Sequence, residues 1–245
     1  MSALWVIVPA FDEQQRLPQT LAALAAQDDV DFTLVVVDNG STDKTAEVAR
    51  AFAPTAPFAV HVLDEPEKGV GCAVDTGFRT AIAAGAAYLA RTDADCLPRR
   101  DWIREIRRGF ADGAELVCGH LVARRDENRP AARAAFRGMV VAAALFGRYR
   151  SKNRGPDYLV PYQMHAGNNM AITADLYLRC GGMPRMPSPT DRTFLNRVRR
   201  CTTRIQQRRA MVSENSMRRI YAYGVLGSAR WYLDRGPGRR TADPR

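Results

Sequence analysis

The chain has 245 residues, of which 46% are hydrophobic and 25% charged, so it can bury one substantial core and is not a disordered protein. A purely apolar run at 140–146 is far shorter than the roughly 20 residues that a membrane-spanning helix needs. Residues 1–8 lack the basic start of a secretion signal, so we expect a cytoplasmic protein. The five cysteines are scattered and never spaced as CxxC, which indicates neither a disulfide framework nor a thiolate metal site.

The net charge of +10 belongs to the C-terminal part of the chain. Residues 179–245 contain 16 arginines and 4 acidic residues, an excess of 12 that leaves residues 1–178 at −2. Two explanations stay open, an arginine-rich composition without a binding role and an anionic partner such as a phosphorylated acceptor or a membrane surface. Nucleic acid is not expected as a partner.

Strand and helix signals alternate along the chain. This alternation predicts an α/β fold with a doubly wound, mostly parallel sheet flanked by helices. In such sheets, ligands bind beyond the carboxyl ends of the strands. Phe136, Met139, Val140, Ala143 and Phe146 recur at helical spacing, and we expect them in the core. The predicted strands are 4–8, 32–37, 58–63, 86–91 and 114–123, and the predicted helices are 15–26, 43–52, 70–84, 100–110 and 131–148.

Three acidic clusters follow predicted strands, "PAFDE" at 9–13, "DNGSTD" at 38–43 and "TDADC" at 92–96. Since side chains alternate along a strand, Asp93 and Asp95 would project from one face. Two crowded carboxylates repel each other, and Mg²⁺ offsets this while it bridges to substrate phosphates. Aspartates at strand ends also cap turns and helices. Three such clusters at one sheet edge nevertheless favour a metal-assisted phosphate site.

Five motifs in order resemble the family 2 glycosyltransferases of the Rossmann-like GT-A fold, over roughly residues 4–200. They are "VIVPAFDE", "VVVDNGSTDKT", "EKGVGCAVDTGFRTA", "RTDADC" and "NNMAITADLYLRCGGMP". The resemblance implies an enzyme that transfers a sugar from a nucleotide-sugar donor to an acceptor hydroxyl.

The resemblance implies a role for each loop. Asp38 would accept the imide N–H of a uracil-type base, Asp93 would lie near the ribose, and Asp95 would ligate Mg²⁺ or Mn²⁺. Asp12 and Asp75 depart from the family pattern, which often has Asn there. The implied nucleotide-sugar contacts are Pro9, Ala10, Phe11, Glu13, Asp38, Lys68 and Asp93.

The general base is expected at Asp191 in "SPTDRTFLNRVRR". The family commonly has Glu-Asp before a helix here, but Thr190 takes the Glu position. A positioned carboxylate that accepts the acceptor's proton contributes typically ~10²–10⁴ in rate. The competing interpretation is a helix start, with Ser188 as N-cap, Pro189 at the first position and Asp191 in the first turn.

The acceptor side is expected around "MHAGNNMAI", where Asn168 and Asn169 would bind hydroxyl groups. His165 is interpreted as a hydrogen-bonded side chain rather than a metal ligand. We divide the chain into a glycosyltransferase domain at 1–212, with a nucleotide-sugar half at 1–112 and an acceptor half at 113–212, and a basic C-terminal helix and tail at 213–245. The tail would dock on its own domain or lie on an anionic membrane.

Three functions stay open. The leading one is a metal-dependent, inverting glycosyltransferase that uses a UDP-sugar and an acceptor, anionic or neutral. A nucleotidyltransferase also uses acidic strand ends and Mg²⁺, but its Gly- and Lys/Arg-rich phosphate loop after the first strand is absent from the sequence. A catalytically idle relative, acting as a binding or membrane-associated partner, is the third.

Overall fold

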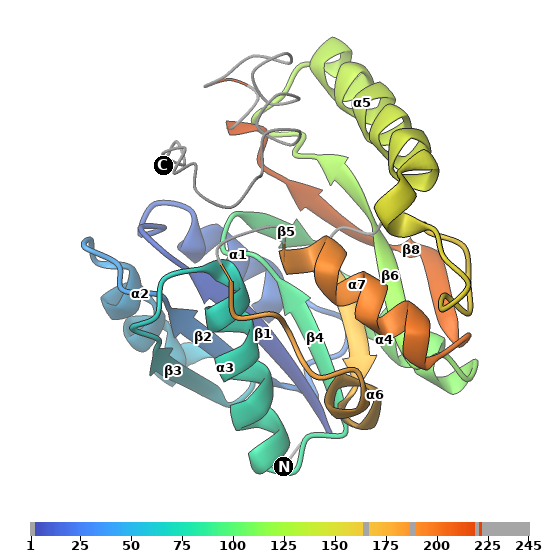
Figure 1. Cartoon of the computed structure of the whole chain (residues 1–245). Coiled ribbons are helices and arrows are strands. Elements are labelled where there is room, and N and C mark those ends of the chain that lie inside the picture. Colours follow the sequence, from blue (N-terminus) through green and yellow to red (C-terminus); the bar gives the residue numbers. More distant parts are fainter. Residues whose placement is uncertain (1–2, 164–166, 187–189, 219–220, 222–245) are drawn as a thin grey trace.

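The computed structural model describes residues 3–163, 167–186, 190–218 and 221. Within these residues, eight strands form one sheet, and helices cover both of its faces (Figure 1). The strands are β1 (Leu4–Ala10), β2 (Thr33–Asp38), β3 (Val60–Asp64), β4 (Tyr88–Thr92), β5 (Cys96–Pro98), β6 (Leu116–Ala123), β7 (Asn169–Thr173) and β8 (Ile205–Asn215). The helices are α1 (Leu17–Ala25), α2 (Thr45–Phe52), α3 (Val70–Ala83), α4 (Trp102–Ala111), α5 (Pro130–Tyr149), α6 (Ala174–Arg179) and α7 (Thr190–Cys201), with short 3₁₀ turns η1 (Ala53–Thr55) and η2 (Ser151–Asn153).

The strands lie in the order β3-β2-β1-β4-β7-β6-β8-β5. The first four pair in parallel, which is the doubly wound arrangement predicted from the sequence. In the second half, β7 is antiparallel to both neighbours, β6 and β8 are parallel, and β5 is antiparallel to β8. The predicted fold class is therefore confirmed, and the antiparallel strands are confined to the second half.

The two strands β1 and β2 are buried along their whole length because helices cover both faces of the sheet. Side chains alternate between the faces along β1. Trp5 and Ile7 pack in the cluster that includes side chains of α3, α6 and α7. Leu4, Val6 and Val8 pack in the cluster that includes side chains of α1 and α4. A continuous apolar run therefore serves two cores at once.

All five predicted strands and all five predicted helices occur, with ends shifted by a few residues. Helix α6 ends shortly before Gly181 and Gly182, whose φ values of 79° and 69° favour glycine. The sequence did not indicate β5, β7 or β8. The sheet continues through Asn215, three residues past the predicted domain boundary. Of the C-terminal helix and tail expected at 213–245, only 213–218 and 221 lie within the described residues.

The expectation for α5 was wrong. None of its residues is buried, and Val141, Leu145, Phe146 and Tyr149 are each more than half exposed. Periodicity shows that a helix has an apolar face but does not show what covers that face. Figure 1 shows α5 standing beside β6 and β8, away from the two packed cores.

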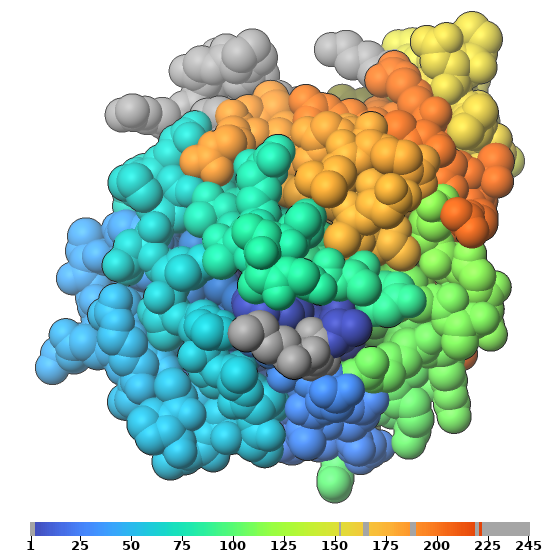
Figure 2. Space-filling model, turned by 90° about the horizontal axis from the view of Figure 1, so that it is seen from below, coloured from blue at the N-terminus to red at the C-terminus, as the bar shows by residue number. Residues whose placement is uncertain are grey.

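The two ends of the parallel strands differ. Seen from below in Figure 2, the edge where β1 starts is filled by packed side chains. The polar loops lie at the opposite edge, where β1, β2 and β4 end. Across the described residues, no helix combines the length and the apolar character needed to cross a bilayer.

Candidate active site

The loops after β1 and β2 are interlocked. Parallel pairing sets Ala10 of β1 beside Asp38 of β2, so the two following loops start side by side. The backbone N–H of Asp12 donates to Ser41 Oγ over 2.9 Å, and Asp12 Oδ1 accepts from the backbone N–H of Thr42 over 2.7 Å. Asp12 has a φ of 53°, which Asp tolerates better than most residues. The departure from Asn at this position therefore keeps a hydrogen-bond acceptor that holds the loop.

Asp38, Phe11 and Lys68 gather at this edge. Asp38 is 7% exposed, and its carboxylate accepts from the Ser41 N–H over 3.1 Å and from the Ser41 hydroxyl. Lys68 Nζ lies 3.8 Å from the centre of the Phe11 ring and donates to the carbonyls of Asn39 and Gly40. The side chains expected to bind the nucleoside thus come from three loops that contact one another.

Asn39 holds this arrangement and was not expected from the sequence. Its Nδ2 donates to the carbonyls of Glu65 and Glu67 over 2.9 and 2.7 Å. Its Oδ1 accepts from the N–H of Gly69 over 2.7 Å, where the φ of 137° favours glycine. Asn39 therefore ties the loop that carries Lys68 to the end of β2.

Asp93 and Asp191 share one buried cation, Arg91. Arg91 Nε donates to Asp93 Oδ1 over 3.0 Å, and Nη1 donates to Asp191 Oδ1 over 2.9 Å. Burial raises the pKa of Asp93, with Asp95 and Asp191 adding to the rise, while Arg91 opposes it. The first aspartate of the D-x-D motif and the candidate base are therefore brought together, although they are distant in sequence.

Asp191 lies in the first turn of α7, with 41% of its side chain exposed. A Cβ at Gly167 would collide with its carboxylate, so the 167–168 turn packs directly on the candidate base. Thr190 is buried, and its methyl group would lie 2.7 Å from a Cβ at Gly71 in the first turn of α3. Ser188 and Pro189 lie outside the described residues, so the predicted N-cap is not described.

Asp95 and Glu13 share a second cation. Arg218 pairs with Asp95 Oδ2 over 3.2 Å and with Glu13 Oε1. Glu13 is 6% exposed, its Oε2 is buried without a hydrogen-bond partner in the described part of the chain, and burial raises its pKa. Two carboxylates directed at one positive charge, with one oxygen left over, fit a divalent cation that also takes phosphate oxygens. The described residues contain no cluster of three metal-ligating side chains, so the remaining ligands of a metal would come from the donor and water.

The two asparagines differ in what they can reach. Asn169 is fully buried, accepts from Trp102 Nε1 over 2.7 Å, and donates to the carbonyls of His120 and Met211. Its amide joins β7 to the elements beside it. Asn168 is partly exposed and donates to Asn215 Oδ1 over 3.1 Å beside the D-x-D loop. His165 lies outside the described residues.

Arg91 and Arg218 were missed as site residues for different reasons. A charged residue inside the predicted strand 86–91 was a signal, because a charge that is buried in a sheet needs a partner. Arg218 is one of the 16 arginines of the basic C-terminal part, and nothing local in the sequence connects it with Glu13 or Asp95.

A family model described as Glycosyl transferase family 2 matches residues 5–176. Glycosyltransferase AglE of Haloferax volcanii is 30% identical over 119 residues, which are 47% of this chain and 38% of that protein. A PGL/p-HBAD biosynthesis glycosyltransferase of Mycobacterium bovis is 30% identical over 121 residues, 49% of this chain and 46% of that protein. The chain thus spans less than half the length of these curated relatives.

Solved structures share the fold over most of the chain. Mannosyltransferase PcManGT from Pyrobaculum calidifontis, in complex with GDP-Man and Mn²⁺, has a TM-score of 0.66 and 24% identity, covering 96% of this chain and 65% of that one. TarS of S. aureus in complex with UDP has a TM-score of 0.64 and 16% identity, covering 89% of this chain and 61% of that one. At these identities the likeness shows the fold.

Proposed function

Because this chain belongs to glycosyl transferase family 2, we propose that it transfers a sugar from a nucleoside-diphosphate sugar to an acceptor hydroxyl. The proposed reaction is a single displacement with inversion, assisted by Mg²⁺ or Mn²⁺, and UDP is the favoured nucleotide. The observation that carries the proposal is the double ion pair of Arg91, which joins the D-x-D motif to the candidate base.

The donor would lie along the loops after β1 and β2. The nearly buried carboxylate of Asp38 can accept an N–H from a base, and the ring of Phe11 offers a flat apolar surface beside it. Lys68 adds a positive charge at the same edge. Pro9 and Ala10 would form the bottom of this donor site, since both are buried at the end of β1. PcManGT is in complex with GDP-Man and TarS is in complex with UDP, which supports a nucleotide at this edge of the sheet. Which nucleobase this chain prefers is left to experiment.

Asp95 would anchor the metal, and Glu13 lies close enough to share Arg218 with it. A bound divalent cation stabilises the negative charge that builds on a departing diphosphate. Arg218 pairs with the same two carboxylates, so the metal would compete with it for them. The Mn²⁺ in the PcManGT complex supports a divalent metal of this type.

Asp191 would take the acceptor's proton. Its Oδ1 accepts from Arg91, which fixes the carboxylate in place, and its side chain remains 41% exposed. A carboxylate that is held in position and partly exposed is suited to receive a proton from a hydroxyl group.

The test is a donor screen. The purified chain is incubated with UDP-, dTDP- and GDP-sugars and Mn²⁺ or Mg²⁺, and nucleotide release and thermal stabilisation are measured. A donor at 100 times its Kd should add ~2.7 kcal/mol of stability. The proposal is supported if one nucleotide class stabilises the protein only when metal is present, and if nucleotide release accompanies this stabilisation. Asp95→Asn should lose the stabilisation. Binding without release, hydrolysis or transfer for any donor would favour the catalytically idle relative instead.

A further inference from the structure

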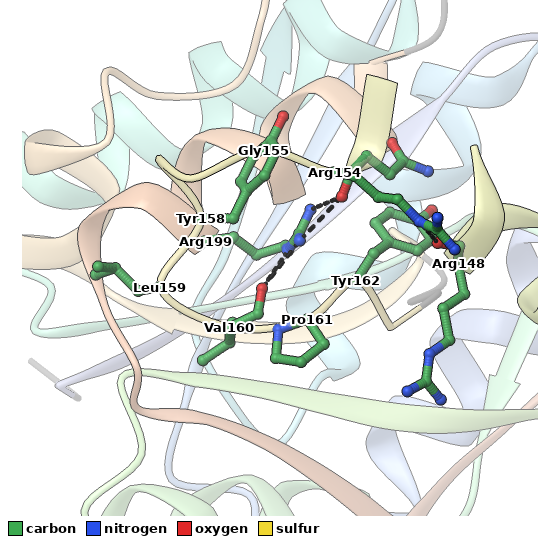
Figure 3. Close-up of a pocket in the computed structure, with 10 residues that line it drawn as sticks. Arg148, Arg154, Gly155, Tyr158, Leu159, Val160, Pro161, Tyr162 and Arg199 are labelled. Atoms are coloured by element: carbon green, nitrogen blue, oxygen red, sulfur yellow. Dashed lines mark hydrogen bonds between the residues drawn. The ribbon is translucent and has the colours of Figure 1, made fainter. Parts of the chain in front are cut away.

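A basic pocket lies apart from the donor loops, between the end of α5, η2 and α7. Its volume is about 330 Å³, and no carboxylate is among the residues that line it. Three arginines, Arg148, Arg154 and Arg199, and two tyrosines, Tyr158 and Tyr162, contribute to its wall (Figure 3). Cations and aromatic rings gathered without an acidic residue are a typical setting for an anion.

Arg199 is 2% exposed, and within the described residues the hydrogen-bond partners of its guanidinium are all neutral. It donates to the carbonyls of Val160 and Asn153 and to Asn196 Oδ1, and the dashed lines in Figure 3 follow the carbonyl bonds. Its guanidinium lies 4.0 Å from the centre of the Tyr158 ring. Burial lowers its pKa. The N–H groups of Arg199 all have hydrogen-bond acceptors, but none of these acceptors carries a negative charge. An anion in the pocket would therefore offset the cost of burying the guanidinium charge.

The neighbouring arginines also lack acidic partners within the described residues. Arg154 donates to the carbonyl of Arg148 and lies over the Tyr149 ring, and Arg150 lies over the Phe146 ring. Elsewhere in this protein, arginines pair with carboxylates, as Arg208 does with Glu105 and Asp112. Asp157 belongs to the same loop as the pocket, but it is exposed, does not line the pocket and has no ion pair within the described residues.

Helix α7 connects the pocket with the candidate base. Asp191 is the second residue of the helix and Arg199 lies eight positions further on, which is about 12 Å along the axis. Tyr162 lines the pocket. Burial raises the pKa of its hydroxyl, the charges of Arg192 and Arg199 lower that pKa, and the charge of Asp191 raises it. A ligand group in the pocket would therefore lie on the acceptor side of the candidate base, within the length of a small molecule.

We propose that this pocket binds a phosphoryl group carried by the acceptor. The proposal rests on the proposed glycosyl transfer, since it gives the acceptor a second anchoring point. Two sources share this chemistry, a soluble phosphate ester and the headgroup of a phospholipid. Arg148 and Arg154 would hold the phosphate oxygens, Arg199 would contribute its charge, and the acceptor hydroxyl would extend toward Asp191.

The experiment measures binding without a donor. Inorganic phosphate and glycerol 3-phosphate are titrated calorimetrically at constant ionic strength into wild type, into Arg148→Gln/Arg154→Gln and into Arg129→Gln/Arg137→Gln. The control pair removes the same charge from exposed positions of the same helix region, outside the pocket. We expect the pocket variant to bind at least tenfold more weakly and the control variant to bind like wild type, with both melting like wild type. If both variants lose phosphate affinity equally, the effect comes from net charge and not from the pocket, and the proposal is overturned.

Vesicles distinguish the two sources. Flotation with phosphatidic acid in phosphatidylcholine, compared with phosphatidylcholine alone, tests the headgroup. Binding to the acidic vesicles with the same variant pattern assigns the phosphoryl group to a lipid, and binding only to the soluble esters assigns it to a soluble acceptor. Binding to neither overturns the site. These binding measurements need no donor, so they can succeed even if the proposed function fails. If the chain is inactive with every nucleotide sugar but still binds phosphate, the proposed function is wrong. The pocket would then still be an anion site, but it would not be an acceptor site.

Discussion

Arg91 donates to Asp191 over 2.9 Å although the two residues lie 100 positions apart. The other side of the same guanidinium holds Asp93. Burial lowers the pKa of Arg91, but Asp93 and Asp191 raise it by more, so the cation persists inside the protein. An ion at this depth is tolerated when it is fully compensated. The start of α7 and the end of β4 are therefore fixed to each other by one charge.

Replacing Arg91 by Met should destabilise the protein strongly, because it leaves two neighbouring carboxylates without their cation. Breaking a buried ion pair costs about 3–5 kcal/mol. Arg50→Met removes the exposed pair of Arg50 with Asp64 and should cost about 1 kcal/mol or less. Urea unfolding of both variants measures the difference. Equal free energies of unfolding for the two variants would show that Arg91 is not a structural ion.

Arg218→Gln should strengthen the binding of Mn²⁺ to the chain in the absence of donor. Arg218 pairs with both Asp95 and Glu13, so its guanidinium and a divalent cation compete for the same two carboxylates. Calorimetric titration with Mn²⁺ measures the affinity. Asp95→Asn should weaken Mn²⁺ binding while the fold remains intact, which circular dichroism checks. Weaker Mn²⁺ binding in Arg218→Gln would mean that Arg218 supports the site and does not compete for it.

Asp38→Ala should weaken free UDP and a UDP-sugar by the same factor, because the base is common to both. The expected cost is about 1.5–3 kcal/mol for a hydrogen bond to a charged group. Part of any stability change will come from the lost acceptor of Ser41, so melting temperature is recorded alongside affinity. A loss confined to the sugar nucleotide would place Asp38 near the sugar and not at the base.

The local patterns of the sequence predicted the strands and helices of the first half of the chain well, and they failed where contacts join distant segments. Apolar runs ending in Asp38 and at Thr92 mark strands whose polar ends must meet at one edge. By contrast, β8 contains "QQRRA", which no strand pattern favours, and it is a strand because β6 and β5 pair with it. The pairing of Arg218 with Glu13 spans 205 positions and leaves no local trace.

Acid should remove a stabilising contribution of Glu115. Burial would raise the pKa of Glu115, but the hydrogen bond from Thr202 and the charges of Arg179 and Arg204 lower it below its ordinary 4.5. A lowered pKa stabilises the fold above the unfolded value, and the contribution fades as pH falls through the folded pKa. The melting temperature of wild type should therefore exceed that of Glu115→Gln most at neutral pH, and the gap should narrow below pH 4.5. Glu47→Gln, at an exposed position of α2, serves as the control, and a gap that does not depend on pH would contradict the prediction.

Asp191→Asn tests the candidate base most directly. The amide oxygen can still accept from Arg91 and keep α7 in place, so donor affinity should survive. Turnover at saturating donor should fall by ~10²-fold or more, because an amide cannot take the acceptor's proton. The measurement is kcat under saturating donor, with donor Kd and melting temperature recorded for the same variant.

The alternative for Asp191 is that it only compensates Arg91. In that case Asp191→Asn should lose stability, since half of the counter-charge of a buried ion is gone, and should keep its turnover. Asp93→Asn removes the other half and provides the comparison, because it also loses the bond to Arg91 but lies on the donor side. Near-wild-type kcat in Asp191→Asn, with a melting temperature lowered as in Asp93→Asn, would exclude the catalytic role. The acceptor would then have to reach the site already ionised, or its proton would have to pass to another group.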